Sequence, residues 1–307
     1  MRTLGSASWI AALALSGLTG CVSEFAADAT ASFLAEAAPG GRAHFDYETA
    51  GIATANGIVQ LEGLHRVSPD NDQLTLLLAQ GYVVYAFGWV MGDYDEAAFA
   101  LDYDRADRIK QRGYLMYSRA EALMHKLFVK RDAEVDKVLH DPEKLLAYLR
   151  EEYDDPEEDV EMVLWWALTW GSTITNSPDF DALVDLPTVK TLARHAMELD
   201  ERYENAGALA LLGGFESSYP EQLGGNWKLG RQYFERAIAL TERRNHLHLI
   251  NFARTYAVNA QDRALFLSLI NEVLQAPDQG NEFRLSNKVA RRRAEVYISH
   301  VDDWFAE

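Results

Sequence analysis

The stretch that decides the fold runs from Asp155 to Tyr203 and reads DPEEDVEMVLWWALTWGSTITNSPDFDALVDLPTVKTLARHAMELDERY. It predicts two helices joined by a short turn. We expect the first helix to begin at Asp155, because aspartate is a good N-cap, proline suits the first turn, and Glu158 completes a capping box. We expect the second helix to begin near Asp185-Leu186-Pro187 for the same reason of proline placement.

The first of these helices is apolar on every side between Met162 and Ile174. A helix without a polar face must be covered by neighbours on both sides. That is how the inner helix of a helical repeat array behaves. Since no strand pattern persists along the chain, the sequence predicts an all-α fold.

A spacing typical of the tetratricopeptide repeat recurs in the chain. The outer helix of that repeat places small, aromatic, alanine and proline residues at set intervals, and one repeat is about 34 residues long. The sequence carries this spacing four times: Gly57-x3-Leu61-x2-Leu64-x4-Pro69, Val189-x3-Ala193-x2-Ala196-x4-Glu201, Gly230-x3-Phe234-x2-Ala237-x4-Glu242 and Leu265-x3-Leu269-x2-Glu272-x4-Pro277. Each match is weak, but four in register predict a tetratricopeptide-like array of helical hairpins, an α-solenoid, as a single domain over residues 46–307.

The remaining segments can be assigned from apolar periodicity and helix breakers. We expect helices over 22–38 (ended by Pro39-Gly40-Gly41), 46–67, 74–90, 105–130, 132–139, 142–150 and 281–304, with a polar loop over 92–104. The acid-rich stretch 151–161 reads as a solvated connector; calcium binding is the alternative, although the oxygen spacing and central glycine of an EF-hand loop are missing. The run Arg291-Arg292-Arg293 is expected to pair with the acidic surface.

The N-terminus has the pattern of a lipoprotein signal peptide. Arg2 precedes an apolar run that ends in Leu18-Thr19-Gly20-Cys21, and the run is too short for a good membrane span. We therefore predict a signal peptide over 1–20, lipidation of Cys21 and a lipidated segment over 21–45. The alternative is an ordinary signal peptide with a chance cysteine. Val22 is not aspartate, which by the sorting habit of enteric bacterial lipoproteins favours the outer membrane over the inner one.

The net charge limits the classes of partner that the protein is expected to bind. The net charge of −18 argues against nucleic acid, which needs a basic face, and against adhesion of the protein surface to anionic lipid. Membrane contact is therefore expected through the lipid anchor only. The uncharged stretch 74–92 must be weighed as a membrane span, but Gln80, three glycines, acids at both edges and the lack of a basic flank argue against it.

Catalytic and metal-binding patterns are missing from the sequence. There is no glycine-rich phosphate loop, no GxSxG elbow and no CxxC pair. Only His246 and His248 lie close together, and two residues apart on a helix they point in different directions. We therefore predict neither an enzyme nor a metal site nor a cofactor.

Aromatic residues are the one unusual feature. Two groups recur at helical spacing: Tyr82, Tyr85 and Trp89, and Trp165, Trp166 and Trp170. Such stripes usually belong to the core. The functional interpretation is that some of these six rings line a groove or channel for a small organic ligand, since ligand sites are mostly apolar with a few polar anchors.

With these residues in view, the chain resembles the T-component (TatT) family of lipoproteins associated with TRAP transporters. The stretches that carry the resemblance are Leu18-Thr19-Gly20-Cys21, the 74–86 helix, Asp159-Val160-x4-Trp165-Trp166-x3-Trp170-Gly171, Asp185-Leu186-Pro187, Glu198-Leu199-Asp200, Gly224-Gly225-x8-Phe234-Glu235-Arg236-Ala237, Gln261-Asp262-Arg263 and Arg291-Arg292-Arg293-Ala294. Gly230, where alanine is usual, and Glu201 and Glu242, where the repeat has proline, depart from the pattern.

The resemblance implies an all-helical fold with cryptic tetratricopeptide units, a homotrimer around a central opening, and a hydrophobic groove or pore in each protomer. It also implies docking to a periplasmic solute-binding protein, to help deliver hydrophobic or organic-acid ligands to a sodium-coupled permease. The expected function is thus a periplasm-facing lipoprotein accessory to a TRAP-type transporter. The alternative is a peptide- or protein-binding adaptor in cell-envelope assembly, which would use a concave repeat face.

Overall fold

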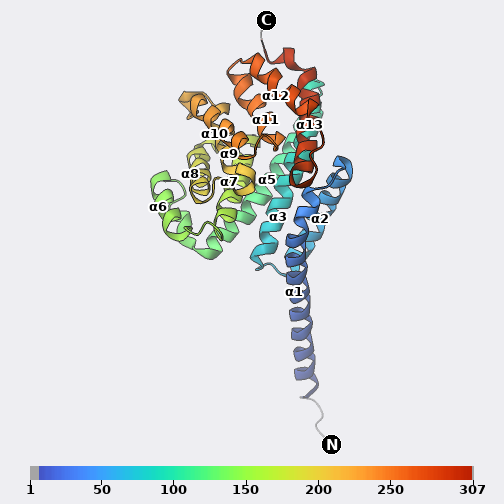
Figure 1. The fold of residues 1–307 in the computed structure, drawn as a ribbon. Coiled ribbons are helices and arrows are strands. Elements are labelled where there is room, and N and C mark those ends of the chain that lie inside the picture. Colours follow the sequence, from blue (N-terminus) through green and yellow to red (C-terminus); the bar gives the residue numbers. More distant parts are fainter. Residues whose placement is uncertain (1–6, 306–307) are drawn as a thin grey trace, which may run out of the picture.

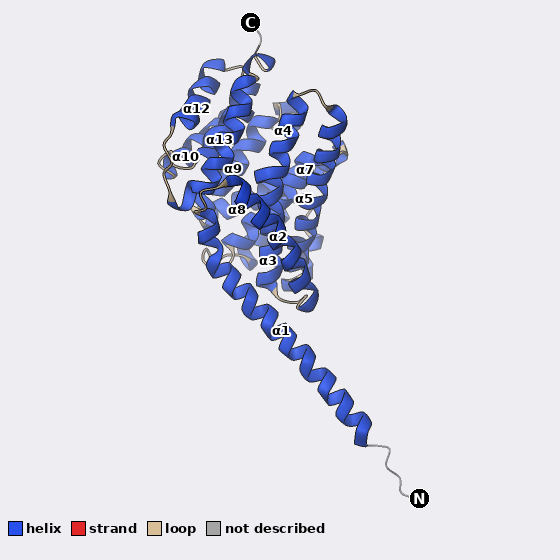
Figure 2. Ribbon diagram, turned by 90° about the vertical axis from the view of Figure 1, so that its right-hand side faces the viewer, coloured by secondary structure: helices blue, strands red, loops and turns tan. Residues whose placement is uncertain are grey.

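The computed structural model describes residues 7–305, with side chains from Val22 onwards apart from that of Asn281. Every regular element in this range is a helix, so the predicted all-α repeat fold is confirmed (Figure 2). In the N-terminal half the elements are α1 (Ala7–Arg42), α2 (Tyr47–Val67), α3 (Asp72–Tyr85), the π-helical η1 (Ala86–Val90), α4 (Met91–Phe99), α5 (Tyr103–Arg131), the 3₁₀ turn η2 (Ala133–Lys137) and α6 (Pro142–Glu152).

The C-terminal half is also built of helices and short helical turns. Its elements are α7 (Val160–Asn176), η3 (Phe180–Asp185), α8 (Leu186–Leu199), α9 (Tyr203–Ser218), η4 (Glu221–Leu223), α10 (Trp227–Leu240), α11 (His246–Phe252), the π-helical η5 (Ala253–Ala257), α12 (Arg263–Gln275), η6 (Asn281–Phe283), α13 (Arg284–Ser299) and η7 (Val301–Asp303). The predicted helix over 281–304 is therefore one α-helix flanked by two 3₁₀ turns.

From α2 to α10, helices pack against helices one or two positions along the chain: α2 on α3, α3 on α5, α5 on α7, α7 on α8, α8 on α9 and α9 on α10. The array then turns back on itself. The last helix, α13, contacts α1, α2, η1 and α4, so the red C-terminal helix lies beside the blue N-terminal helices (Figure 1). The first and last parts of the chain thus share one seam.

The stretch that organises the fold behaves largely as expected, with one correction. α8 begins at Leu186 with Pro187 in its first turn. α7 begins at Val160, not at Asp155. The Asp155 carboxylate does accept hydrogen bonds from the backbone N–H groups of Glu157 and Glu158, but these residues form an isolated turn before the helix. The buried carboxylate of Asp159 holds that turn in place, because it accepts from the Asp155 N–H and pairs with an arginine of α5.

Two other predicted boundaries are wrong. Pro39 does not end α1, which runs on to Arg42: a proline four residues from the end removes one backbone donor, and its own carbonyl still accepts from the Ala43 N–H at 3.2 Å. The predicted polar loop over 92–104 is mostly the helix α4. Its buried face, which includes Ala97, packs on α5, and tertiary contact outweighs the weak local helix signal.

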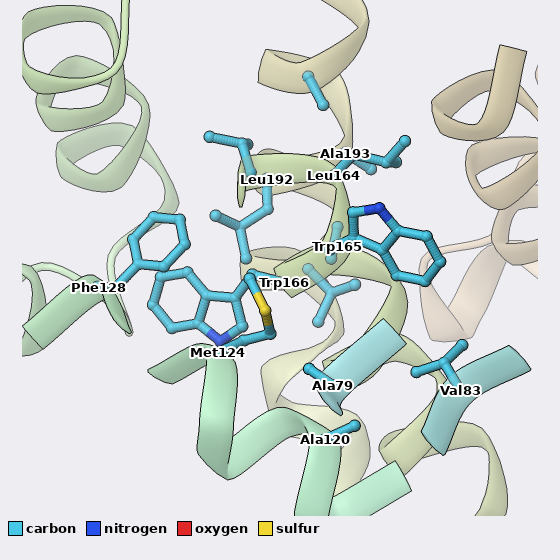
Figure 3. Packing of buried hydrophobic residues seen from close by; sticks show 14 of the residues in the cluster. Ala79, Val83, Ala120, Met124, Phe128, Leu164, Trp165, Trp166, Leu192 and Ala193 are labelled. Atoms are coloured by element: carbon cyan, nitrogen blue, oxygen red, sulfur yellow. The ribbon is translucent and has the colours of Figure 1, made fainter. Parts of the chain in front are cut away.

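Two large apolar cores, with a small third cluster of Ala206, Leu209 and Ala237, lie between the described helices. The larger one spans α2 to α9 and is centred on Trp166, which lies beside Phe128 and Met124 (Figure 3). The smaller one joins α10 to α13 and includes Phe234, Phe266 and other residues of the last helices. Burial of one such large side chain contributes about 1.5–3 kcal/mol, so most of the stability of the fold comes from these two clusters.

The helix from Asp72 to Phe99 is the one described segment that is long and apolar enough to cross a membrane. Half of its most apolar window is buried inside the protein, where α3 packs on α2 and α5. Core packing is therefore sufficient to explain its composition.

Candidate functional site: a cleft at the seam of the array

The second predicted aromatic group belongs to the larger core. Trp166 has no exposed surface, and Trp165 is 8% exposed, whereas Trp170 is partly exposed at the edge of the core. The Trp166 ring lies 4.0 Å from the ring of Phe128 and 5.6 Å from that of Trp170, centroid to centroid. These rings come from α5 and α7, so they help to hold the two helices together.

The first predicted group lies on α3 and η1. A further ring, Tyr47 of α2, which was not selected from the sequence, belongs to the same aromatic row. The rings of Tyr85, Trp89 and Tyr47 stack in a row at 5.8 and 5.3 Å, and the Trp89 indole N–H donates to the Tyr47 carbonyl at 3.1 Å. Gly51 is required beneath this row, because a Cβ atom there would overlap the Trp89 ring. The sixth ring, Tyr82, donates its hydroxyl to Glu62 at 2.9 Å. A ligand role for the six rings stays a prediction.

The π-helical turn η1 sits next to this aromatic row. In a π turn each backbone carbonyl accepts a hydrogen bond from the N–H five residues later, instead of four as in an α-helix, which interrupts the regular α-helical hydrogen bonds. Such turns are frequent at functional sites. Here the Phe87 carbonyl accepts from Nη2 of Arg293 at 2.6 Å, and the Gly88 carbonyl accepts from the Tyr47 hydroxyl at 2.8 Å. The turn therefore binds α2 on one side and α13 on the other.

A cleft opens where α4 and α13 meet, which we call the seam cleft. Its volume is about 350 Å³, and its walls are formed by Glu96, Phe99, Ala100, Arg292, Glu295, Val296, Ser299 and His300. The wall includes the Phe99 ring, on which the His300 ring stacks at 4.3 Å. A cleft of this volume is within the size range of sites that hold small ligands.

Behind the seam cleft lies a smaller space, the inner void, of about 10 Å³. It is lined by Tyr47, Gly88, Gly92, Asp95, Glu96, Val289, Arg292, Arg293 and Val296. Glu96, Arg292 and Val296 belong to both spaces, so the two adjoin.

Two consecutive arginines of α13 dominate the chemistry of this region. Arg292 donates to Glu96 at 2.8 Å, lies 3.5 Å from Glu48 and covers the Tyr47 ring. Arg293 is only 8% exposed and stacks on the Phe87 ring, with its guanidinium carbon 4.0 Å from the ring centre. The Nε atoms of both arginines are buried and make no hydrogen bond.

Carboxylates on α4 complete the electrostatics. Asp95 accepts from the Tyr297 hydroxyl at 2.9 Å, and burial raises the pKa of its carboxyl group. Burial also raises the pKa of Asp93, with a smaller contribution from the charge of Glu96. Burial raises the pKa of the Tyr47 phenol to about 12, so it stays a neutral donor. The seam is thus a polar layer between the two apolar cores.

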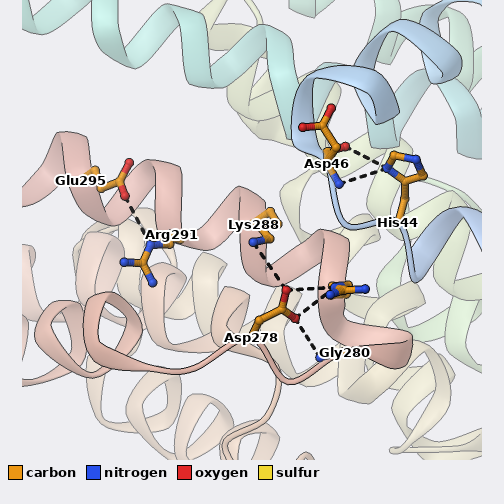
Figure 4. Close-up of polar contacts among 8 residues, drawn as sticks. His44, Asp46, Asp278, Gly280, Lys288, Arg291 and Glu295 are labelled. Atoms are coloured by element: carbon orange, nitrogen blue, oxygen red, sulfur yellow. Dashed lines mark hydrogen bonds and ion pairs between the residues drawn. The ribbon is translucent and has the colours of Figure 1, made fainter.

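The remaining arginine of the run, Arg291, lines neither the seam cleft nor the inner void. Arg291 pairs with Glu295 at 3.4 Å, near a pocket where Asp278 accepts from the Gly280 N–H and from Arg284 and lies 3.6 Å from Lys288 (Figure 4). The expectation that the arginine run pairs with acids is therefore correct for Arg291 and Arg292. It is wrong for Arg293, which reaches a backbone carbonyl because its position on the helix faces η1.

His246 and His248 have separate environments. The Nε2 atom of His246 lies 3.2 Å from the Gln279 amide, and Nε2 of His248 lies 2.7 Å from the Asn205 carbonyl. Among the residues that the structure describes, no group of histidine, cysteine and carboxylate side chains is arranged to hold a metal ion.

Comparison with protein families matches residues 44–305 to the TRAP transporter T-component family. No curated protein matches the chain. The match includes both apolar cores, the η1 turn and the seam cleft. It indicates an accessory role to a TRAP transporter and a place in the cell envelope.

Proposed function

We propose, since the chain belongs to the TRAP transporter T-component family, that it is a lipid-anchored, periplasm-facing subunit that binds the solute-binding protein of its transporter. The family match over residues 44–305 is the observation that carries this proposal. We further propose that it assembles as a homotrimer and holds a small hydrophobic or organic-acid ligand. Trp165, Trp166, Trp170, Tyr82, Tyr85 and Trp89 remain candidates for contact with an apolar part of that ligand.

The geometry of α1 supports anchoring through Cys21. The N-terminal half of α1 projects away from the body (Figure 2). Farther along, Ala27 and Ala31 are buried against the body, and the Asp28 carboxylate accepts from Ser68 and Asn71, both at 2.7 Å. If the chain is cut before Cys21, the lipid chains would sit at the start of a helix whose next turns are fixed to the body.

Capture from a periplasmic extract tests the proposed partner. The lipid-free protein, immobilised, is expected to retain a solute-binding protein, which mass spectrometry would identify. Repeated recovery of other proteins with no solute-binding protein among them would contradict the proposal. The anchor is tested separately: Cys21→Ser should move the protein from the membrane fraction to the soluble periplasmic fraction, and an unchanged membrane fraction would exclude lipidation as the anchor.

A general envelope adaptor is the second candidate, and an exposed apolar segment favours it. Phe180 and Val184, four residues apart in the 3₁₀ turn η3, are 86% and 77% exposed. Large exposed apolar side chains on one short segment often mark protein contacts. The variant Phe180→Ser separates the two roles in the same experiment. Loss of a solute-binding protein places the transporter contact at η3, whereas loss of unrelated envelope proteins supports the adaptor.

A further inference from the structure

We propose that the seam cleft binds a monocarboxylate with a short apolar chain, and that one oxygen of its carboxylate enters the inner void to meet Arg292 and Arg293. This inference deepens the proposed function, because it names the class of ligand and the residues that recognise it. It does not depend on which solute-binding protein is the partner.

The first argument is the state of Arg293. Its side chain is more than nine-tenths buried, and its hydrogen bond goes to the Phe87 carbonyl rather than to a carboxylate. Among the described side chains, no acid lies within ion-pair distance of it, and the nearby carboxylate of Asp95, which accepts from Tyr297, acts on it only at longer range. A buried cation without a direct ion pair is costly, and such groups are normally paired or fully hydrogen-bonded. An anion beside Arg293 would supply that ion pair.

The second argument is the pair of unused donors. The Nε–H groups of Arg292 and Arg293 are buried and have no acceptor, and both residues line the inner void. Buried donors without a partner are rare in native proteins and call for a water molecule, an ion or a ligand. The inner void, at about 10 Å³, has room for one water molecule or one carboxylate oxygen. Guanidinium groups are well suited to carboxylates, because several N–H groups can bind the two oxygens.

The third argument is the shape of the neighbouring space. The seam cleft shares Arg292 and Val296 with the inner void, so a ligand that has one carboxylate oxygen in the void can extend into the cleft. There the wall offers Phe99 and Ala100 to an apolar chain. The volume of about 350 Å³ is enough for several carbon atoms.

The fourth argument limits the charge of the ligand. Glu96 and Glu295 line the cleft, and Asp93, Asp95 and Glu48 lie close to the arginines. A second negative charge on the ligand would meet these acids, so a monocarboxylate is favoured over a dicarboxylate. Glu96 can release Arg292 at little cost, because its side chain is about one-third exposed and exposed ion pairs are weak.

Calorimetry on the full lipoprotein in lipid nanodiscs, with empty nanodiscs as the blank, tests the proposal. Hexanoate should bind, whereas hexylamine and hexanol should bind at least about 10-fold more weakly, since a charge-assisted hydrogen bond is lost. Acetate should bind more weakly than hexanoate because it lacks the apolar chain. Equal binding of hexanoate and hexanol would overturn the proposal.

Variants locate the site. Arg292→Gln and Arg293→Lys should each weaken hexanoate binding by about 10-fold or more, and Phe99→Ala should weaken hexanoate more than acetate. The matched control is Arg284→Gln, which removes an arginine of the same helix that pairs with Asp278 and lines neither the seam cleft nor the inner void, and it should leave binding unchanged. Circular dichroism checks that each variant is folded. If Arg293→Lys fails to fold, Arg292→Gln carries the test.

The outcome is distinguishable from failure of the proposed function. Capture of a solute-binding protein together with unchanged hexanoate binding by Arg292→Gln would keep the function and reject the seam site. Hexanoate binding that needs Arg292, with no solute-binding protein captured, would keep the seam site and reject the partner.

Discussion

Removal of the Trp166 ring is the sharpest test of how the larger core is held together. The ring has no exposed surface and contacts aromatic rings of two helices, Phe128 at 4.0 Å and Trp170 at 5.6 Å between centroids. Truncation of a fully buried tryptophan to alanine usually costs about 3–5 kcal/mol, because the apolar burial is lost and a cavity remains. We expect Trp166→Ala to lower the free energy of unfolding by about 4 kcal/mol, a large part of the 5–15 kcal/mol typical of a protein.

Urea unfolding followed by circular dichroism at the helical band measures this change. The midpoint should fall while the slope with urea stays the same, since the surface exposed on unfolding hardly changes. Phe180→Ala is the matched control, because it also removes a large ring, but from a position that is 86% exposed. That control should change the free energy by no more than about 0.5 kcal/mol.

The reasoning would be refuted if Trp166→Ala were within about 1 kcal/mol of the unmodified protein, the size expected of a partly exposed residue. If that stable variant also lost affinity for an apolar ligand, Trp166 would be a groove residue, as the sequence allowed. A loss of about 4 kcal/mol would instead assign the ring to the core.

Three further predictions concern single features of the fold. In urea unfolding, Gly225→Ala should destabilise the protein by about 1–3 kcal/mol, because the added Cβ atom would overlap a backbone carbonyl. Gly214 lies within α9 and has open space around it, so Gly214→Ala should stabilise the protein by about 0.5–1 kcal/mol. Lys190 lies 2.6 Å from the carboxylate of Glu216, which is 2% exposed. Lys190→Met should lower the free energy of unfolding by about 3 kcal/mol, because this buried carboxylate loses its main partner. Adding Glu216→Leu should restore most of the loss in a double-mutant cycle. Burial lowers the pKa of His248 from 6.5 to about 4, so below pH 6.5 the unfolded chain takes up a proton at this residue while the folded protein keeps it neutral. The free energy of unfolding should therefore fall between pH 7 and pH 4, by about 2 kcal/mol at pH 5. The variant His248→Gln should flatten this part of the pH profile.

Local signals in the sequence were sufficient for many helix positions. The predicted helices at 46–67 and 74–90 begin within two residues of α2 and α3, which the side chains of Asp46 and Asn71 cap. Pro187 lies in the first turn of α8, and the tryptophans of α7 are buried or half-buried. These features depend on residues within a few positions of each other, so they can be predicted without knowledge of the fold.

Wrong boundaries arose where distant contacts outweighed local preference. Polar residues between Gly92 and Asp104 suggested a loop, yet Ala97 packs on α5 and the segment is helical. Asp155 had the pattern of a helix cap, but the carboxylate of Asp159, which pairs with Arg131 of α5, takes its backbone N–H and delays the helix. Neither the packing of Ala97 on α5 nor the pairing of Asp159 with Arg131 leaves a mark in the nearby sequence.

The sequence by itself determined that this protein is a helical array with a buried tryptophan-rich helix, because helix periodicity, capping and breakers act over a few residues. Only the tertiary structure decided that α13 returns to η1 and α4 to form the seam cleft. The arginine run was visible in the sequence, but the partners of Arg292 and Arg293, Glu96 and the Phe87 carbonyl, lie about 200 residues earlier in the chain. Whether two helices so far apart in the sequence come into contact depends on the summed rotations of all the hairpins between them. No local sequence pattern determines this sum.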